Sequence, residues 1–359
     1  MINKPVRVLV GMSGGVDSSV AAALLVEQGV DVTGAFMKQW SDTKDVSGLC
    51  SWKQDRRDAL RVAAHLGIPL LTLDFEQEYR ESVMSYLFTE YSAGRTPNPD
   101  VLCNKDIKFG AWLRTAQRLG FSHLATGHYA QIQSSTKEGI TQYQLLSSVD
   151  EEKDQTYFLH QLNQEQLAHT LFPIGGYTKK QVRELAKKYH LPTADRAESM
   201  GICFVGEMPM KQFLEQKIPH TPGDIRMSTG EIIGTHDGLA FYTIGQRHGF
   251  EQVGGGRPLF VVQKKFAENQ LIVGYDDDPL LYTKEVLLDT MDWVSGQTPT
   301  LPLHCRVRTR HRQPLQEATI VWSEEKYSLL FLEKQKAITP GQFAVLYHRD
   351  ACLGGGIIS

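Results

Sequence analysis

The sequence lacks the cysteine patterns that mark metal sites and disulfide frameworks. Its 359 residues contain no CxxC pair and no Cys/His spacing typical of zinc. We therefore expect no structural metal and no iron–sulfur cluster, and a reducing cytosol argues against a disulfide scaffold. The five cysteines stand far apart in the chain, at Cys50, Cys103, Cys203, Cys305 and Cys352.

Long apolar runs and a strong charge imbalance are also missing. No run reaches the roughly 18 apolar residues that a membrane span needs, and the N-terminus lacks the charged-then-apolar pattern of a signal peptide. We expect a cytoplasmic protein without membrane association, and a monomer. The formal net charge of -3 excludes a uniformly basic surface, so a nucleic-acid partner would be held by local basic patches.

The first third of the chain alternates between strand patterns and helix patterns. We expect strands at 7–11, 31–37, 70–75 and 123–132, and helices at 17–28, 53–66, 77–92 and 105–119. Gly29, Gly67 and Gly120 stand where helix C-caps belong. This alternation predicts an α/β fold with a doubly wound parallel sheet, whose ligands bind at the carboxyl ends of its strands.

Beyond residue 204 the pattern becomes β-rich. Turn signals between short alternating runs at 220–249 predict a small antiparallel domain. Runs at 303–308, 317–321, 327–332 and 342–347 recur at a spacing suited to an antiparallel β-barrel. The predicted domains are therefore an α/β domain at 1–204, a central β-rich domain with its linker at 205–279, and a C-terminal barrel at 280–359.

The loop after the first expected strand, GMSGGVDSS at 11–19, lacks a lysine. A glycine-rich turn between a strand and a helix usually cradles phosphate, because backbone N–H groups and the helix N-terminus favour an anion. A loop of the form GxxxxGK[ST] would have glycine and lysine in place of Val16 and Asp17. Here the hydroxyls of Ser13 and Ser18 would assist the backbone, while Asp17 would cap the helix or meet a magnesium ion. A turn without any ligand is the alternative.

The order serine-glycine-glycine-x-aspartate-serine in this loop resembles the PP-loop of ATP pyrophosphatases, which cleave ATP between its α- and β-phosphates. Further motifs narrow the resemblance to the tRNA-specific 2-thiouridylases, the MnmA family. They occur in order along essentially the whole chain: GAFMKQW (34–40), GRTPNPDVLCNKDIKF (94–109), ATGHYA (125–130), KDQTYFL (153–159), MGICFVGE (200–207), PGD (222–224), TIGQRHG (243–249) and PGQ (340–342). The resemblance implies a tRNA-uridine 2-sulfurtransferase that activates the 2-carbonyl of the wobble uridine with ATP and Mg²⁺ and replaces its oxygen by sulfur.

The resemblance also implies roles for individual residues. The ATP site would comprise Gly11, Met12, Ser13, Gly14, Gly15, Val16, Asp17, Ser18, Met37 and Gly127; the target base would meet Asn98, Pro99 and Asp100; and tRNA would contact His128, Lys153, Asp154, Gln155, Arg310, His311 and Gln342. The family more often has tyrosine at the position of His311, although an imidazole can also stack on a base. The implied partners are the tRNAs for Lys, Glu and Gln and a sulfur-donor protein that carries a persulfide.

Thiolation of a carbonyl group needs two thiols. Carbonyl oxygen leaves poorly, so AMP transfer must first convert it into a phosphate ester; a cysteine persulfide can then deliver sulfur, and a second thiol can resolve the S–S bond. Cys103 stands just before an expected helix, near Lys105 and Lys108, and both features lower a thiol pKa. A small buried hydrophobe is the alternative for Cys103.

The resemblance assigns Cys203 as the persulfide carrier and Cys103 as the nucleophile and resolving thiol. Formation of a disulfide between them would bring their α-carbons within about 7 Å at some stage. Context alone leaves Cys203 equally compatible with a core position. Cys50, Cys305 and Cys352 are expected to be packing residues.

Two further residues are candidates for proton transfer and ligand binding. Asp100 is expected to exchange a proton with the uracil or a thiol, since a carboxylate in a covered site can have a raised pKa; a turn residue after Pro99 is the alternative. His128 follows a strand-end glycine, where ligands gather, and the alternative for it is a hydrogen-bonded structural histidine.

Two basic stretches are candidate RNA-binding surfaces. Arg306, Arg308, Arg310 and Arg312 alternate with Cys305, Val307, Thr309 and His311. On a strand this period of two would send all four guanidinium groups to one face, roughly 7 Å apart. The alternative is that these arginines form a solvated strand face. The basic helix expected at 178–189 is a second candidate surface, and the alternative for it is a solvated helix face.

Two other functions account for part of the sequence. A PP-loop ligase acting on a small metabolite would use the nucleotide loop but neither the cysteines nor the arginine strand. A non-catalytic RNA-binding protein would use the basic strand but would not need the intact loop.

Overall fold

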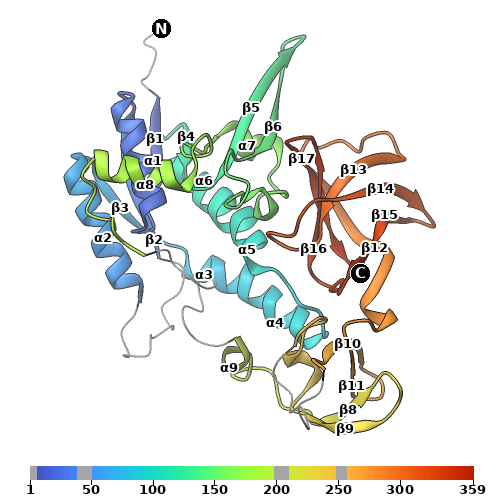
Figure 1. Cartoon of the computed structure of the whole chain (residues 1–359). Coiled ribbons are helices and arrows are strands. Elements are labelled where there is room, and N and C mark those ends of the chain that lie inside the picture. The colour runs from blue at the N-terminus through green and yellow to red at the C-terminus, as the bar shows by residue number, and fades with distance from the viewer. Residues whose placement is uncertain (1–5, 39–50, 198–209, 248–256) are drawn as a thin grey trace.

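The computed structural model describes residues 6–38, 51–197, 210–247 and 257–359. Three parts follow one another along the chain: an α/β domain, a small β-rich domain at one end, and a barrel beside the first domain (Figure 1). Cys50 and Cys203 lie outside the described residues, so the predictions made for them stay predictions.

A parallel five-stranded sheet forms the centre of the α/β domain. Its strand order is β3-β2-β1-β4-β7, with β1 (Arg7–Gly11), β2 (Asp31–Lys38), β3 (Leu70–Asp74), β4 (His123–Ala125) and β7 (Thr170–Leu171). Consecutive residues of β1 face opposite sides, because Val8 and Val10 belong to one apolar cluster and Leu9 to another. The sheet therefore needs helices on both faces, as the sequence predicted.

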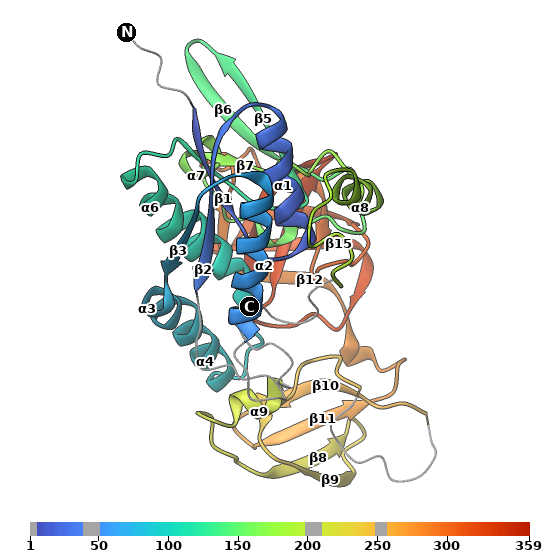
Figure 2. The same ribbon diagram turned by 90° about the vertical axis from the view of Figure 1, so that its left-hand side faces the viewer.

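The two helical layers are built from different parts of the chain. On the side of Val8 and Val10 pack α1 (Val16–Glu27), α2 (Ser51–Leu66) and α8 (Lys179–Lys188) (Figure 2). On the side of Leu9 lie two long helical stretches. The first joins α3 (Glu76–Tyr79), the π-helical η1 (Arg80–Met84) and α4 (Ser85–Ser92), and the second joins α5 (Pro99–Leu102), the π-helical η2 (Cys103–Trp112) and α6 (Leu113–Arg118).

The second stretch begins earlier than the sequence pattern predicted. Helix was expected from residue 105, whereas α5 starts at Pro99. Proline is favoured at the first helical position, since its missing N–H would have no partner there and its fixed φ suits a helix. Cys103 consequently lies inside the helical stretch rather than before it.

The strand expected at 123–132 is two strands in two sheets. β4 ends at Ala125, and β5 (Ala130–Lys137) starts after Gly127. β5 and β6 (Ile140–Ser147) form a long hairpin that projects from the molecule (Figure 1). The apolar pattern continues across both strands, so it gave no sign of the break.

The central domain carries a four-stranded sheet of order β10-β11-β8-β9. Its elements are α9 (Met210–Leu214), β8 (Gly223–Met227), β9 (Ile232–His236), η4 (Leu239–Phe241), β10 (Phe260–Lys265) and β11 (Gln270–Gly274). An antiparallel sheet was predicted, but the sheet is mixed, because β8 and β11 pair in parallel. These two strands are far apart in sequence, which leaves room for the crossover that parallel pairing requires.

The C-terminal part is a closed antiparallel barrel, as predicted. Its strands follow the order β12-β15-β14-β13-β16-β17, and β17 pairs back with β12. They are β12 (Tyr282–Trp293), β13 (Leu303–Arg308), β14 (Gln316–Ser323), β15 (Lys326–Lys336), β16 (Phe343–His348) and β17 (Ala351–Ile358), preceded by η5 (Pro279–Leu281).

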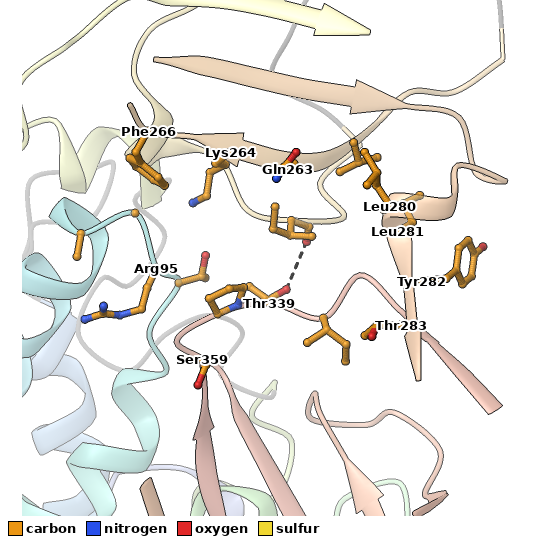
Figure 3. A pocket seen from close by; sticks show the side chains of 17 residues that line it. Arg95, Gln263, Lys264, Phe266, Leu280, Leu281, Tyr282, Thr283, Thr339 and Ser359 are labelled. Atoms are coloured by element: carbon orange, nitrogen blue, oxygen red, sulfur yellow. Dashed lines mark hydrogen bonds between the residues drawn. The ribbon is translucent and has the colours of Figure 1, made fainter. Parts of the chain in front are cut away.

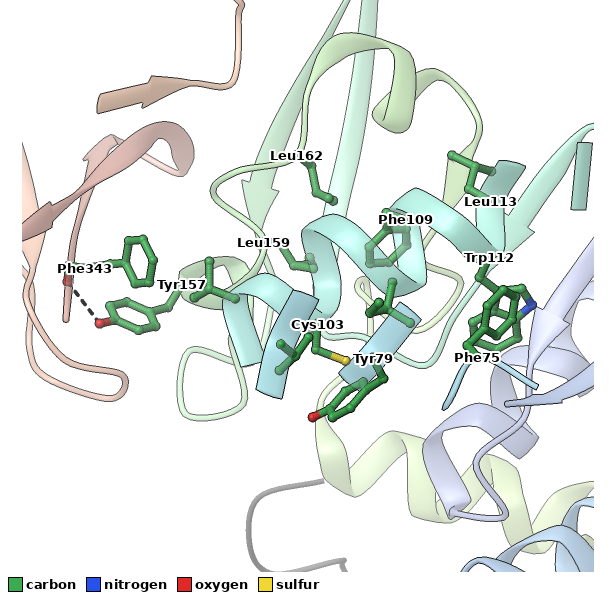
Figure 4. Close-up of a cluster of buried hydrophobic side chains, with 14 of the residues drawn as sticks. Phe75, Tyr79, Cys103, Phe109, Trp112, Leu113, Tyr157, Leu159, Leu162 and Phe343 are labelled. Carbon is green, nitrogen blue, oxygen red and sulfur yellow. Dashed lines mark hydrogen bonds between the residues drawn. The ribbon is translucent and has the colours of Figure 1, made fainter. Parts of the chain in front are cut away.

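The barrel and the α/β domain share both a sheet and a core. β17 also pairs with β6, so the hairpin extends the barrel sheet. One apolar cluster contains Leu9 of the central sheet. The same cluster includes Cys103 of the second helical stretch and Phe343 of the barrel (Figure 4). The short elements η3 (Thr156–Phe158) and α7 (Gln164–Ala168) both contact β6 of the hairpin, and η3 also contacts α5. In the described ranges no helix is long and apolar enough to cross a membrane.

The expected row of four arginines is not formed. β13 ends at Arg308, and Arg312 adopts a left-handed backbone conformation with φ of 64°. The chain turns here because the Gln313 N–H bonds back to the Arg310 carbonyl. The inward positions Cys305 and Val307 are buried as predicted, but only Arg306 and Arg308 share the opposite strand face.

Candidate active site

The PP-loop connects the end of β1 with the start of α1. The Ser13 and Ser18 hydroxyls lie 3.2 Å apart, and the Ser18 hydroxyl donates to the Gly15 carbonyl at 3.1 Å. Gly15 is the N-cap of α1, and among the described residues no side chain caps this helix end. A helix start without a side-chain cap suits an anion, because its first N–H groups can donate to one.

Two glycines allow the chain to pass close to this loop. Gly14 has φ of 79°, and a Cβ atom there would lie 2.4 Å from the carbonyl oxygen of Asp55. A Cβ atom on Gly127 would lie 2.6 Å from the backbone nitrogen of Ser18. The two segments matched to the ATP site, 11–18 and Gly127, therefore meet at the start of α1. Met37 lies near the carboxyl end of β2, the neighbour of β1 in the sheet.

A lysine does reach the loop, but it comes from another helix. The ammonium of Lys179 donates to Oδ1 of Asp17 at 2.7 Å and to Oδ2 at 2.8 Å. The hydroxyl of Tyr129 donates to the same Oδ1 at 2.9 Å. Lys179 is the first residue of α8, and sequence reasoning counted it only among the charges of a basic helix. Its place beside Asp17 depends on the packing of α8 on α1, which no local pattern reveals.

Arg196 is a second residue that sequence reasoning missed. Its guanidinium donates to the Gly14 carbonyl at 2.7 Å and to Asp58 at 3.1 Å, and it also binds Asp55. It thereby ties α2 to the left-handed turn of the PP-loop. Because all three partners are distant in sequence, only the folded chain assembles this group.

The start of the second helical stretch holds the proposed target-base residues. Asn98 is the N-cap of α5, and Asp100 lies in the first turn. Burial raises the pKa of Asp100 above its usual range, while the positive charge of Lys108 acts in the opposite direction. A carboxylate with a raised pKa is a stronger base than an ordinary aspartate, which suits proton transfer.

Cys103 lies one turn further along the same helical stretch. Its backbone N–H already bonds to the Pro99 carbonyl, so it is not one of the exposed donors at the helix start. The residue is 2% exposed and belongs to the apolar cluster of Tyr79, Phe109 and Leu159 (Figure 4). The prediction that Cys103 precedes a helix was wrong, since Pro99 starts the helix earlier; its role as a nucleophile stays a prediction.

His128 lies close to the same helix. Its Nδ1 is 2.7 Å from the Thr126 hydroxyl, and its ring centroid is 5.7 Å from that of Phe109. Burial lowers the pKa of His128 well below its usual range, and the charge of Lys108 adds to this effect. At neutral pH the ring is uncharged, so it would meet RNA by hydrogen bonding or stacking rather than as a cation. Lys108 acts on both Asp100 and His128, which sequence reasoning did not foresee.

The 153–155 segment is joined to the PP-loop through Tyr129. The side-chain oxygen of Gln155 accepts from the Tyr129 N–H at 2.9 Å, and the Gln155 N–H donates to the Tyr129 carbonyl at 2.9 Å. Asp154 points inward instead: it is 2% exposed and accepts hydrogen bonds from the Thr156 hydroxyl and from Arg308. The predicted tRNA contacts of Lys153, Asp154 and Gln155 stay predictions.

Three other residues matched to tRNA contacts gather where the domains meet. Nη2 of Arg310 donates to the carbonyls of Ile244 and Ala337 at 3.0 and 2.8 Å. The His311 ring lies 4.5 Å from the ring of Phe158, and burial lowers the pKa of His311 to about 4. Gln342 bonds to the loop that precedes α5.

The remaining described cysteines have the surroundings of packing residues. Cys305 and Cys352 are 4% and 3% exposed. Burial raises the pKa of Cys305 to about 12 and raises that of Cys352 as well. Both are thus thiols rather than thiolates near neutral pH. Within the described residues, no cluster of three or more His, Cys, Asp or Glu could hold a metal ion.

Comparison with known proteins identifies the family. Family models match residues 6–207 (tRNA methyl transferase HUP domain), 211–275 (tRNA methyl transferase PRC-barrel domain) and 283–358 (Aminomethyltransferase beta-barrel domain). A protein of Listeria monocytogenes serotype 4b (strain CLIP80459) named tRNA-specific 2-thiouridylase MnmA is 47% identical over 359 residues, covering 99% of this chain and 95% of the relative. The chain belongs to the tRNA-specific 2-thiouridylase MnmA family.

Other MnmA proteins match equally well. One from Bacillus cytotoxicus (strain DSM 22905 / CIP 110041 / 391-98 / NVH 391-98) is 48% identical over 355 residues, covering 98% of this chain and 94% of the relative. A solved structure titled as a 4-thiouridine synthetase–RNA complex with bound ATP has a TM-score of 0.34 and 17% identity, covering 58% of this chain and 50% of that chain.

Membership of the MnmA family confirms three predictions. The resemblance inferred from the motifs is correct, and so is the class of enzyme, a tRNA sulfurtransferase. The fold class is also correct, with a PP-loop domain, a β-rich middle domain and a C-terminal barrel. The roles of individual residues and the domain boundaries remain predictions.

Proposed function

We propose that this protein catalyses ATP-dependent 2-thiolation of the wobble uridine of tRNA. It would transfer AMP to the uracil 2-oxygen, take sulfur from a cysteine persulfide, and release AMP and pyrophosphate. The observation that carries the proposal is the meeting of the PP-loop with Lys179 and Gly127 at the start of α1, in a chain of this family. The Asp100–Cys103 helix of the same domain adds a proton acceptor and a thiol.

ATP would bind with its phosphates at the N-terminus of α1. The N–H groups of the loop and the hydroxyls of Ser13 and Ser18 would hold the leaving pyrophosphate. Asp17 would repel phosphate if it were alone, but Lys179 balances its charge. Mg²⁺ would arrive with ATP, since phosphate oxygens and water supply most of its ligands in such sites, and Asp17 is the loop carboxylate that could add one ligand.

In the first step the uracil 2-oxygen would attack the α-phosphorus of ATP. The bond from the α-phosphorus to the bridging oxygen breaks, pyrophosphate leaves, and the uracil N3 gives up its proton. Asp100 is proposed to take this proton, because its raised pKa makes it a better base than an exposed aspartate. The product is an O2-adenylated uridine, whose AMP group can leave.

In the second step the terminal sulfur of a persulfide on Cys203 would attack C2. AMP leaves, and the uridine is briefly joined to Cys203 through an S–S bond. The Cys103 thiolate then attacks the sulfur of Cys203, which forms a Cys103–Cys203 disulfide and releases 2-thiouridine. A thiol reductant must reduce this disulfide before the next turnover, and a persulfide-carrying protein must reload Cys203.

The test is a reaction of the whole protein with unmodified tRNA, ATP, Mg²⁺ and a persulfide donor. Nucleosides are analysed by mass spectrometry, and AMP and pyrophosphate are measured in parallel. We expect 2-thiouridine at the wobble position of tRNAs for Lys, Glu and Gln, with one AMP and one pyrophosphate per thiouridine. Formation of AMP with a small acceptor in the absence of tRNA would indicate a metabolite ligase. Binding of tRNA without AMP formation would indicate an RNA-binding protein.

A further inference from the structure

The loop before α5 is the point where all three domains meet. It comprises residues 94–98, ends at Asn98 and leads directly into the helix that carries Asp100. From the barrel, the Pro340 carbonyl accepts a hydrogen bond from the Thr96 N–H at 2.9 Å. From the central domain, the Thr243 hydroxyl lies 3.2 Å from the Thr96 hydroxyl. A cavity of about 380 Å³ borders this junction, and Arg95 and Thr339 are among the residues that line it (Figure 3).

The side chain of Gln342 joins the barrel to the loop through two hydrogen bonds. Its Nε2 donates to the carbonyl oxygens of two consecutive residues, Thr96 at 2.8 Å and Pro97 at 3.2 Å. The Gln342 backbone is itself fixed to the barrel, since its carbonyl accepts from the Ile358 N–H at 2.8 Å. A side-chain amide has two N–H donors, and here both have an acceptor.

Gly341 explains how the barrel comes so close. It has φ of 87°, and a Cβ atom there would lie 2.9 Å from Cβ of Arg95 and 3.0 Å from the Thr96 nitrogen. Pro340, Gly341 and Gln342 therefore each contact the loop, through a carbonyl, a close approach and a side-chain amide. Each residue of the PGQ motif thus has a contact within the protein, and none of these contacts involves RNA.

The entry of the chain into α5 depends on such contacts. Among the described residues, no side chain caps this helix, and Asn98 stands at its N-cap. Its start is held by Pro99 and by the loop. A shift of the loop would move Asn98 and Asp100 together, and misplacement by about 1 Å can cost a hundredfold in rate.

We propose that Gln342 is a positioning residue, which holds the 94–98 loop so that Asn98 and Asp100 face the target uridine. The inference rests on the proposed function, because it takes the uridine as the group to be positioned. It assigns the barrel a part in turnover in addition to any part in tRNA affinity. Gln342 acts through the loop, and the tRNA contact implied by the family resemblance is not needed for this role.

The test compares Gln342→Met with Gln316→Met in the whole protein. Gln342→Met keeps the side-chain length and removes both donors. Gln316 is a half-buried residue of β14, and its side-chain amide donates to the nearby Pro314 carbonyl. The kcat and the KM for tRNA are measured for thiolation, together with the tRNA Kd and the unfolding midpoint. We expect Gln342→Met to lower kcat by about 10–100-fold with a tRNA Kd within twofold of wild type. Gln316→Met should match wild type, and Gln342→Lys, which restores donors, should recover part of kcat.

Amide hydrogen exchange separates this proposal from the proposed function. Faster exchange at 96–102 in Gln342→Met, but not in Gln316→Met, is expected whether or not the protein thiolates tRNA. If the wild-type protein makes no 2-thiouridine while amide exchange at 96–102 is faster in Gln342→Met, the proposed function is wrong. The Gln342 contact with the loop is then still supported. Unchanged exchange, or a weaker tRNA Kd with normal kcat at saturating tRNA, would overturn the positioning role.

Discussion

The ammonium of Lys179 lies within 2.8 Å of both carboxylate oxygens of Asp17, although the two residues are 162 positions apart. The folded chain thus places a lysine from α8 beside the PP-loop, whose own sequence contains none. If the phosphates of ATP bind at the start of α1, as we propose, we expect the same ammonium to turn from the carboxylate to the phosphates.

Lys179→Ala is expected to slow pyrophosphate release strongly. Loss of one charged donor from a site of developing negative charge costs about 10²–10³-fold in rate. Lys180 is exposed on the next position of α8, so Lys180→Ala is the matched control and should leave the rate within twofold. The measurement is tRNA-dependent pyrophosphate release at saturating ATP. Equal rates for the two variants would mean that Lys179 only pairs with Asp17.

Gly14→Ala is expected to disable the PP-loop. The left-handed φ of 79° disfavours alanine, and its Cβ would meet the Asp55 carbonyl oxygen at 2.4 Å. Gly29→Ala is the control, because Gly29 has φ of 75° with open space around it. Both variants should lose roughly 1 kcal/mol of stability from backbone strain, and Gly14→Ala should lose more because of the Asp55 contact. Only Gly14→Ala should lose pyrophosphate release. Denaturant unfolding and the pyrophosphate assay together check this expectation.

Most of the architecture could be predicted from the sequence because its signals are local. Glycines at helix ends marked C-caps, and Gly29, Gly67 and Gly120 all adopt positive φ. The strand at Arg7–Gly11 and the barrel strand at Leu303–Arg308 have the predicted bounds. In each case the residue pattern itself carries the information.

What could not be predicted depends on contacts between distant segments. Lys179 and Arg196 reach the PP-loop only after α8 has packed on α1, and no spacing in the sequence reports that packing. The start of the Cys103 helix was misplaced, because helix was expected from residue 105 whereas Pro99 is the first helical residue. The arginine row failed for a local reason: β13 ends at Arg308, and the chain then turns at residues 310–313.

Cys103→Ser is expected to abolish 2-thiouridine formation but to leave tRNA-dependent pyrophosphate release. The reason is that AMP transfer needs no thiol, whereas resolution of the S–S bond does. Cys305→Ser and Cys352→Ser should both retain thiolation, with a loss of about 1–3 kcal/mol in stability from a buried hydroxyl. Nucleoside analysis and pyrophosphate release are measured on the same samples. Wild-type thiolation by Cys103→Ser would rule out its role as the resolving thiol.

Asp100→Asn is expected to stabilise the fold at neutral pH while it slows AMP transfer by about 10²–10⁴-fold. Burial raises the folded-state pKa of Asp100, so the stability that this carboxyl contributes is present below its unfolded-state pKa and is lost as pH rises through the folded pKa. Asparagine does not titrate. The variant should therefore unfold at a higher denaturant concentration than wild type at pH 7–8, and the difference should vanish at about pH 3–4. A difference independent of pH would contradict this.

Arg308→Met is expected to destabilise the protein by about 3–5 kcal/mol, because it leaves the carboxylate of Asp154 buried without its cationic partner. The Arg308 side chain is 11% exposed and that of Asp154 is 2% exposed. Arg306 shares its strand face but donates to the Arg349 carbonyl nearer the surface, so Arg306→Met should cost about 1 kcal/mol or less. Urea unfolding of both variants is the measurement. Equal losses of unfolding free energy in the two variants would show that the Arg308–Asp154 pair contributes no more to stability than the Arg306 contact does.

The pairing of the hairpin with the barrel has a consequence for synthesis of the chain on the ribosome. β6 meets β17 at Leu146 opposite Ala351 and at Leu145 opposite Cys352. The partner strand is therefore made about 200 residues later, which at about 5–20 residues per second means a wait of roughly 10–40 s. During that time the nascent chain carries an open strand edge of the kind that pairs with other chains. The α/β domain, although translated first, gains its last neighbour only when residues 351 and 352 have emerged.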